Sequence, residues 1–196
     1  MGGRMTRGYG LLEPALARLR ARMANRLIPP GHRQARILDV GCGSYPYFLS
    51  HTSFAEKFAV DQVADPGPLA GITWHPLDLN SFPPLPFEDG YFSVVTLLAV
   101  VEHVDPESLV KLFQESRRVL GPDGMVILTT PAAWSDRLIH FMAGIALVSQ
   151  EEIEEHVYAY TLPLLGWYFG AAGFAMEDLR FGYFEFGLNL WATARR

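Results

Sequence analysis

Apolar residues follow two different periods along this chain, and segments of the two periods alternate. Short apolar runs of the kind that form buried strands lie at residues 36–40, 57–61, 72–76, 91–98 and 125–129. Segments with apolar residues at helical spacing fall before and among these runs. Alternation of this kind predicts a parallel sheet covered by helices on both faces, with ligands at the carboxyl ends of the strands.

The helical segments carry their own start and stop signals. Residues 13–28 place Leu16, Leu19, Met23 and Leu27 on one predicted face, with Pro14 in the first turn and Pro29-Pro30 as the stop. A second helix is expected to begin behind Asp105-Pro106 and to end at Gly121-Pro122, and a third covers residues 161–172. Pro46 predicts a further first turn, capped by Ser44 or Tyr45.

The C-terminal part of the chain departs from the alternation. Residues 174–180 and 187–193 both read as strands, and the segment between them is too short to hold a helix. Two strands so joined must run antiparallel. The sequence therefore predicts a parallel sheet that ends in an antiparallel hairpin.

We expect a single domain over residues 1–196, because the chain holds no internal repeat and no linker-like stretch. Within it we expect four parts. These are an N-terminal arm and helix (1–30), a ligand-binding core (36–130), a lid-like insert (131–173) and the C-terminal hairpin (174–194).

Charge and cysteine content narrow the function classes. Sixteen Lys and Arg against 21 Asp and Glu give −5, so the chain lacks the basic excess that coats nucleic acid. Residues 1–36 nevertheless hold eight arginines and one acid, a balance compatible with weak contact at an anionic membrane surface. The single cysteine excludes an intrachain disulfide and favours the cytoplasm. The longest apolar run, 138–148, is too short to span a membrane.

The strongest chemical signal is the sequence Ile37-Leu-Asp-Val-Gly-Cys-Gly43 at the end of the first strand. Gly41 and Gly43 let the backbone approach a ligand closely at the turn into a helix. A nicotinamide dinucleotide would require a third glycine where this chain has Pro46. Asp39 before the glycines is also a poor neighbour for a pyrophosphate, and it favours a ligand with positive charge.

These residues resemble the first motif of the class I S-adenosylmethionine-dependent methyltransferases, in particular the small-molecule branch of the type 11/12 families. Asp39, Gly41 and Gly43 match that motif, and Tyr45 stands where the family has a third glycine. Two later segments also resemble the family: Val101-Glu-His-Val104 after the fourth strand and the R-R-V-L-x-P-x-G type sequence from Arg117 to Gly124.

The resemblance implies a Rossmann-like, doubly wound, three-layered α/β fold of seven strands in the order 3-2-1-4-5-7-6, with strand 7 antiparallel. It also implies S-adenosylmethionine as cofactor. Asp61 then corresponds to the acid that binds the ribose hydroxyls, and Asp78, with Leu79 beside it, to the acid that receives the adenine amino group. Cys42, Gln62 and Leu97 complete the predicted cofactor site, although the thiol of Cys42 is expected to pack as a small residue, because the sequence offers it no base partner nearby.

For the acceptor, the resemblance implies a small molecule. Eleven of the 25 aromatic residues lie between Tyr158 and Trp191, which suits an apolar or ring-containing acceptor or, alternatively, a packed core. His103 and His156 are the candidate general bases, and no metal site is expected. A nucleic-acid acceptor is disfavoured because residues 96–99 lack the Asn/Asp-Pro-Pro-aromatic motif of base-amino methyltransferases.

Two rival functions remain at this point, and the oligomeric state stays open. One rival is a nicotinamide-dependent oxidoreductase, which Pro46 and the terminal hairpin disfavour. The other is a non-catalytic protein of the same fold that binds the cofactor or a partner.

Overall fold

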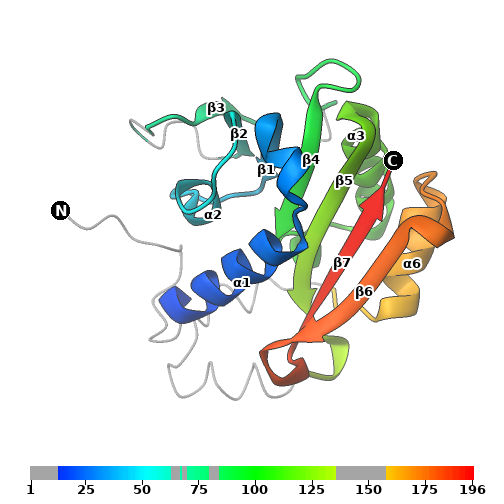
Figure 1. The fold of residues 1–196 in the computed structure, drawn as a ribbon. Helices are drawn as coiled ribbons and strands as arrows, with labels where there is room; N and C mark the ends of the chain where they lie inside the picture. The colour runs from blue at the N-terminus through cyan, green and yellow to red at the C-terminus, as the bar shows by residue number, and fades with distance from the viewer. Residues whose placement is uncertain (1–12, 63–66, 68–69, 80–83, 136–157) are drawn as a thin grey trace.

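The chain folds into one seven-stranded sheet with helices on both faces, in a computed structural model that describes residues 13–62, 67, 70–79, 84–135 and 158–196 (Figure 1). The strands are β1 (Arg36–Val40), β2 (Glu56–Asp61), β3 (Thr73–Pro76), β4 (Phe92–Leu98), β5 (Leu120–Pro131), β6 (Leu179–Phe184) and β7 (Asn189–Arg195). The helices are α1 (Glu13–Leu27), α2 (Tyr47–Ser50), α3 (Pro106–Val119) and α6 (Leu162–Ala171). Short 3-10 turns are η1 (Pro30–Gln34), η2 (Val101–His103), η3 (Ala133–Ser135), η4 (Met176–Asp178) and η5 (Glu185–Gly187).

The sheet order β3-β2-β1-β4-β5-β7-β6 confirms the predicted topology. Neighbouring strands from β3 to β5 pair in parallel, whereas β7 runs antiparallel to both β5 and β6. The strand order reverses between β1 and β4, which is where open α/β sheets leave a crevice at their carboxyl edge.

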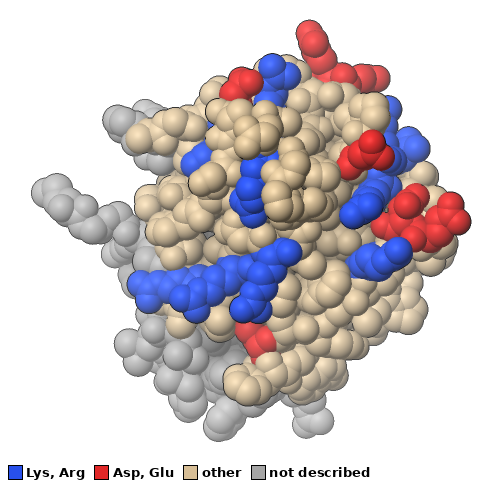
Figure 2. All heavy atoms as spheres, in the orientation of Figure 1, with Lys and Arg blue, Asp and Glu red and all other residues tan. Residues whose placement is uncertain are grey.

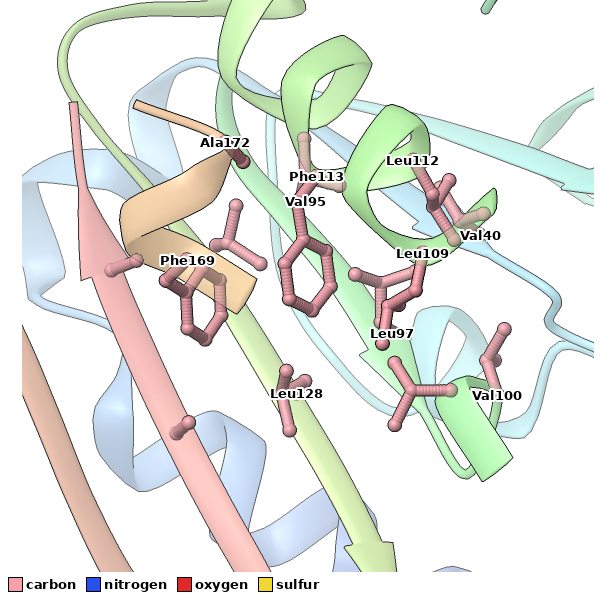
Figure 3. Close-up of a cluster of buried hydrophobic side chains, with 14 of the residues drawn as sticks. Val40, Val95, Leu97, Val100, Leu109, Leu112, Phe113, Leu128, Phe169 and Ala172 are labelled. Carbon is pink, nitrogen blue, oxygen red and sulfur yellow. The ribbon is translucent and has the colours of Figure 1, made fainter. Parts of the chain in front are cut away.

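Residues alternate between two cores along the central strands. Leu38, Val95 and Val126 face one core and the adjacent Ile37, Val94 and Met125 face the other. Helices α3 and α6 cover the first core (Figure 3), where the rings of Phe113 and Phe169 stack with centroids 4.3 Å apart. Helices α1 and α2 cover the second core.

Helix α1 packs through a face that differs from the predicted one. Ala21, Ala24 and Ile28 are buried, whereas the side chain of Leu19 is 41% exposed. The prediction that Leu19 faces the core is therefore wrong, because small alanines let the helix approach the sheet more closely than a leucine row would. The Arg33 guanidinium fixes the end of α1 by donating to the carbonyl oxygen of Asn25 at 2.9 Å.

Two predicted boundaries also need correction. The first hairpin strand begins at Leu179, not at residue 174, because residues 176–178 form the turn η4. Helix α2 has only four residues and starts after Pro46, with no side-chain cap, so the expected Ser44 or Tyr45 cap is wrong. Asp105, by contrast, caps α3 as predicted: its carboxylate accepts from the backbone N–H groups of Glu107 and Ser108.

Much of the expected lid-like insert, including His156 and the apolar run 138–148, lies outside the described residues. Both described flanks of that segment meet at the carboxyl edge of β5. The N–H of Ala133 donates to the carbonyl oxygen of Tyr160 at 3.0 Å, and Ala132 and Tyr160 form an isolated bridge. In the part of the chain that the structure describes, no helix combines the length and apolarity needed to cross a membrane.

The stacked pair in the first core sets a prediction for stability. Phe113 and Phe169 are fully buried, so Phe113→Ala leaves a cavity between α3 and α6. We expect the free energy of unfolding to fall by about 3–5 kcal/mol in urea denaturation. Gln114→Ala, at the exposed neighbouring position, should change it by less than about 0.5 kcal/mol. Equal effects of the two substitutions would contradict this packing.

Candidate functional site

The glycine turn after β1 is shaped by its contact with the segment after β4. Gly41 has φ +70°, and a Cβ at this position would lie 2.6 Å from Cγ2 of Val100. Gly43 also has a positive φ, of +71°, but a Cβ there would meet nothing within 4 Å. The turn is therefore closed at Gly41 and open at Gly43, which leaves room beside the backbone of Gly43 for a ligand.

Asp39 is a buried carboxyl in the middle of the sheet's carboxyl edge. It is 3% exposed, and Thr96 on the adjacent strand donates its hydroxyl to Oδ1 of Asp39 at 2.6 Å. Burial raises the pKa of Asp39 to about 7, the Thr96 hydrogen bond lowers it, and the nearby Asp61 raises it further. About half of the Asp39 side chains are therefore protonated at pH 7, and a cation bound nearby would favour the ionised form.

Asp61 ends β2 on the other side of the glycine turn. It is 4% exposed, and its Oδ2 accepts the backbone N–H of Gly43 at 2.7 Å. Its carbonyl oxygen accepts the N–H of Leu77 at 2.8 Å, which ties it to the chain after β3. The structure therefore brings the carboxyl of Asp61 to the open position at Gly43, with Asp39 close to Asp61.

The remaining predicted cofactor residues lie at different depths. Cys42 is half-buried, with its Sγ 3.9 Å from the carbonyl oxygen of Val60. Gln62 and Asp78 are exposed just after β2 and β3, and Leu79 packs against the first core. Leu97 is fully buried between β4 and α3 (Figure 3). The side chain of Leu97 therefore belongs to the core. The predicted cofactor contact at Leu97 stays a prediction.

A second polar cluster lies at the carboxyl ends of β4, β5 and β6, away from the glycine turn. Glu102 is 1% exposed, and neither of its carboxyl oxygens has a hydrogen-bond partner among the described residues. The hydroxyl of Thr130 lies close enough to lower the pKa of Glu102, although no hydrogen bond of normal length and angle joins the two groups. Glu185, in the turn between β6 and β7, has one unpartnered oxygen within the same described set, and Asn189 donates to the other.

Arg20 of α1 connects these two carboxyls electrostatically. Burial raises the pKa of Glu102 and that of Glu185, and the Arg20 charge opposes the rise at both. The sequence pattern did not single out Arg20 or Glu185. A signal for Glu102 existed, since it is an acid that follows two valines directly after an apolar strand.

The predicted base His103 lies next to this cluster, in η2. It is half-buried, and its positive form would lower the pKa of Glu102. The returning end of the insert is fixed here as well. The N–H of Tyr158 donates to the carbonyl oxygen of Glu102 at 3.3 Å, and the Tyr160 hydroxyl donates to that of Val101 at 3.2 Å. His156 lies outside the described residues, so its role stays a prediction.

Comparison with known proteins identifies the family. A family model described as a methyltransferase domain matches residues 11–179. The chain belongs to the class I S-adenosylmethionine-dependent methyltransferase family. A search of curated protein sequences found no match.

Solved methyltransferases share the fold at low sequence identity. An S-adenosylmethionine-dependent methyltransferase from Mesorhizobium loti is 18% identical with a TM-score of 0.66, covering 92% of this chain and 100% of its own. One from Archaeoglobus fulgidus is 20% identical with a TM-score of 0.64, covering 94% of both chains. A structure of the Haloferax volcanii Trm112 methyltransferase activator with a methyltransferase gives 15% identity and a TM-score of 0.71, covering 94% of this chain and 91% of that chain.

The residues at the β1–β2 edge fit the cofactor that the family uses. The carboxyls of Asp39 and Asp61 supply acceptors and negative charge, and the open side of Gly43 supplies space between them. A methyl sulfonium is cationic, so it suits this charge balance in a way that a pyrophosphate does not.

The raised pKa of Asp39 predicts how stability depends on pH. In the folded protein the carboxyl holds its proton up to about pH 7, whereas in the unfolded chain it loses the proton near pH 3.8. The free energy of unfolding therefore falls as the pH rises from about 3.8 to about 7. In Asp39→Asn this fall is absent. We expect the unfolding free energy of the variant, relative to wild type, to rise by about 2 kcal/mol between pH 5.5 and 8 in urea denaturation without ligand. The control Glu88→Gln, at an exposed position, should show no such trend. A difference between Asp39→Asn and wild type that stays constant with pH would refute this assignment.

Proposed function

We propose that the protein transfers a methyl group from S-adenosylmethionine to a small-molecule acceptor by in-line displacement. The observation that carries the proposal is the division of the sheet's carboxyl edge at the switch point between β1 and β4. On one side lie the glycine turn and the carboxyls of Asp39 and Asp61. On the other side lies the polar cluster of Glu102, Glu185 and Arg20.

The first side suits the donor. Asp61, at the end of β2, is placed to accept hydrogen bonds from ribose hydroxyls, with Asp39 holding negative charge below the glycine turn. Asp78 and Gln62, exposed at the neighbouring strand ends, remain the proposed contacts for the adenosine. The half-buried Cys42 is assigned to packing, and its reduced thiol is consistent with the proposed cytoplasmic location.

Replacing Asp61 tests the donor side. Asp61→Ala removes charge-assisted hydrogen bonds worth about 1.5–3 kcal/mol each. We expect the affinity for S-adenosylhomocysteine, measured by calorimetry, to fall by at least about tenfold. Glu107→Ala, an exposed acid in α3, should leave it unchanged. Unaltered affinity in Asp61→Ala would remove the basis for the ribose assignment.

The second side suits the acceptor. Buried carboxyl oxygens at Glu102 without partners in the described chain are costly unless a bound group donates to them. Tyr158 is half-buried, and its backbone N–H donates to the carbonyl oxygen of Glu102. We therefore propose an acceptor that combines an apolar or ring-shaped body with a hydrogen-bond donor such as a hydroxyl or amine.

The chemistry requires little from the protein beyond alignment. When bound, S-adenosylmethionine supplies an already activated methyl group, and correct orientation of the two reactants is worth about 7–11 kcal/mol. If the acceptor atom carries a proton, His103 is the proposed base, since η2 places it beside the acceptor cluster.

A screen with labelled donor tests the proposal. Metabolite pools are incubated with the protein and methyl-labelled S-adenosylmethionine, and products are sought by mass spectrometry as a gain of one labelled methyl group. We expect labelled product with wild type, and a decrease in kcat of about 10²–10⁴-fold in His103→Asn with unchanged S-adenosylhomocysteine affinity. Cofactor binding without any labelled product would instead support the non-catalytic alternative.

A further inference from the structure

A threonine lies opposite the buried carboxyl of the donor side, in a strand whose interior is otherwise apolar. Thr96 of β4 and Asp39 of β1 are directly paired, so their side chains share one face of the sheet. Thr96 is fully buried, and its hydroxyl lies 2.6 Å from Oδ1 of Asp39 and 3.3 Å from the carbonyl oxygen of Leu38. A valine would fill nearly the same space, and a buried hydroxyl is costly unless it is hydrogen-bonded. The hydroxyl at this position therefore has a reason beyond packing.

A second buried threonine shows that this face of the sheet does not require such a bond. Thr129 of β5 lies two residue pairs further along the β4–β5 ladder, on the same face. It is 1% exposed, and its hydroxyl has no hydrogen-bond partner among the described residues. The hydrogen bond of Thr96 therefore reflects the carboxyl beside it and not a general property of threonines in this sheet.

The hydrogen bond fixes one oxygen of Asp39 and leaves the other available to a ligand. Oδ1 accepts from Thr96, whereas Oδ2 has no hydrogen-bond partner among the described residues. The backbone of Asp39 is held as well, because it is paired with β2 on one side and with β4 on the other. Two residues further on, the Val100 side chain closes against Gly41. Contacts from β4 and the segment after it therefore hold this stretch of β1 in place.

The charges around Asp39 make this hydrogen bond decisive for its ionisation. Burial and the Asp61 charge at the end of β2 both raise the pKa of Asp39, and the Thr96 hydroxyl lowers it. The strand β4 carries no titratable side chain, and Cys42 is the titratable residue of the glycine turn. Of the helices on this face, α2 carries only Tyr47 as a titratable group, and Figure 2 shows the basic side chains of α1 in a row along its outer surface. The pKa of Asp39 has no contribution from those basic groups.

We propose that Thr96 is a positioning residue for the methyl donor: its hydroxyl holds the Asp39 carboxyl in place and favours the ionised form, and it thereby sets the pH range over which S-adenosylmethionine binds. This role rests on the proposed donor site at Asp39 and Asp61 and adds a residue to it. A cationic sulfonium binds more strongly beside a carboxylate than beside a neutral carboxyl. A protein without the Thr96 hydroxyl should therefore reach its full donor affinity only at a higher pH than the wild-type protein.

The pH dependence of donor affinity tests the proposal. Thr96→Val removes the hydroxyl and Thr96→Ser keeps it, and calorimetry measures the Kd of S-adenosylmethionine between about pH 6 and about pH 9 for each protein. Loss of a hydrogen bond to a charged group should raise the pKa of Asp39 by about one pH unit. We therefore expect Thr96→Val to bind about fivefold more weakly than wild type at about pH 7 and within about twofold of it at about pH 9. Thr96→Ser should follow wild type, and titration of the ligand itself cancels in comparisons at equal pH.

Matched controls separate this role from a general effect on the fold. Thr129→Val removes a buried hydroxyl that has no described partner, and it should leave the pH dependence unchanged. In an Asp39→Asn background, Thr96→Val should change the affinity by the same factor at every pH. A ligand-free readout is the carbon NMR titration of the Asp39 carboxyl, whose midpoint should rise from about 7 in wild type to about 8 in Thr96→Val. Thr96→Ala, a second variant without the hydroxyl, should show the same upward shift.

The proposal is overturned if removal of the Thr96 hydroxyl leaves the NMR midpoint of Asp39 at its wild-type value, or if it lowers donor affinity by the same factor at every pH. An equal shift of the pH profile in Thr129→Val would also overturn it, because any buried hydroxyl would then have the effect. Absence of donor binding by the wild-type protein at every pH is a separate outcome. It would overturn the proposed function, and this role of Thr96 with it, even where the NMR midpoint moves as expected.

Discussion

The Asp39 carboxyl is buried at the place where the strand order of the sheet reverses, and the rest of the site is arranged around it. Its single described hydrogen bond comes from Thr96 across the β1–β4 pair, so the side chain is fixed by the two strands that open the crevice. A buried carboxyl with one hydrogen bond and an acid nearby is held partly neutral. A cationic ligand would lower the pKa of Asp39, because it favours the ionised form that burial disfavours.

The same principle applies to the part of the edge that we propose for the acceptor. Burial also raises the pKa of Glu102 and of Glu185, and one oxygen of Glu185 has no hydrogen-bond partner among the described residues. The His103 and Arg20 charges oppose this rise at Glu102, and the Arg20 charge opposes it at Glu185. Glu102, Glu185 and Arg20 come from η2, η5 and α1, which lie far apart in sequence. Buried polar groups without partners among the described residues gather at this one edge of the sheet, which is the basis for proposing a ligand there.

A parallel sheet that ends in an antiparallel hairpin was predictable from the pattern of apolar runs, because buried parallel strands read as apolar runs and the spacing of the last two strands allows only a hairpin. The order of the strands followed from the family resemblance. The residues proposed for the donor site could also be named from the sequence, since Asp39 lies near the end of β1, Gly41 and Gly43 follow β1, and Asp61 ends β2. Details set by tertiary contact could not. The alanines of α1 are weak hydrophobic signals compared with Leu19, yet they form the buried face.

The proposed acceptor side could not be predicted from the sequence for a related reason. An acid after a strand usually lies in solvent, whereas Glu102 is buried where η2 packs against β5, which comes later in the chain. The exposure of Phe186 was equally hidden, because a phenylalanine in an aromatic-rich hairpin reads as core. Its orientation follows from the left-handed turn, which Gly187 alone does not reveal.

Proton uptake or release on ligand binding measures the central feature most directly. Calorimetric titration of S-adenosylmethionine at pH 7, in two buffers of different ionisation enthalpy, reports the protons exchanged. If Asp39 is half protonated and faces the cation, binding should release about half a proton, and Asp39→Asn should release none. Tight binding with no proton exchange in the wild-type protein at pH 7 would contradict the account.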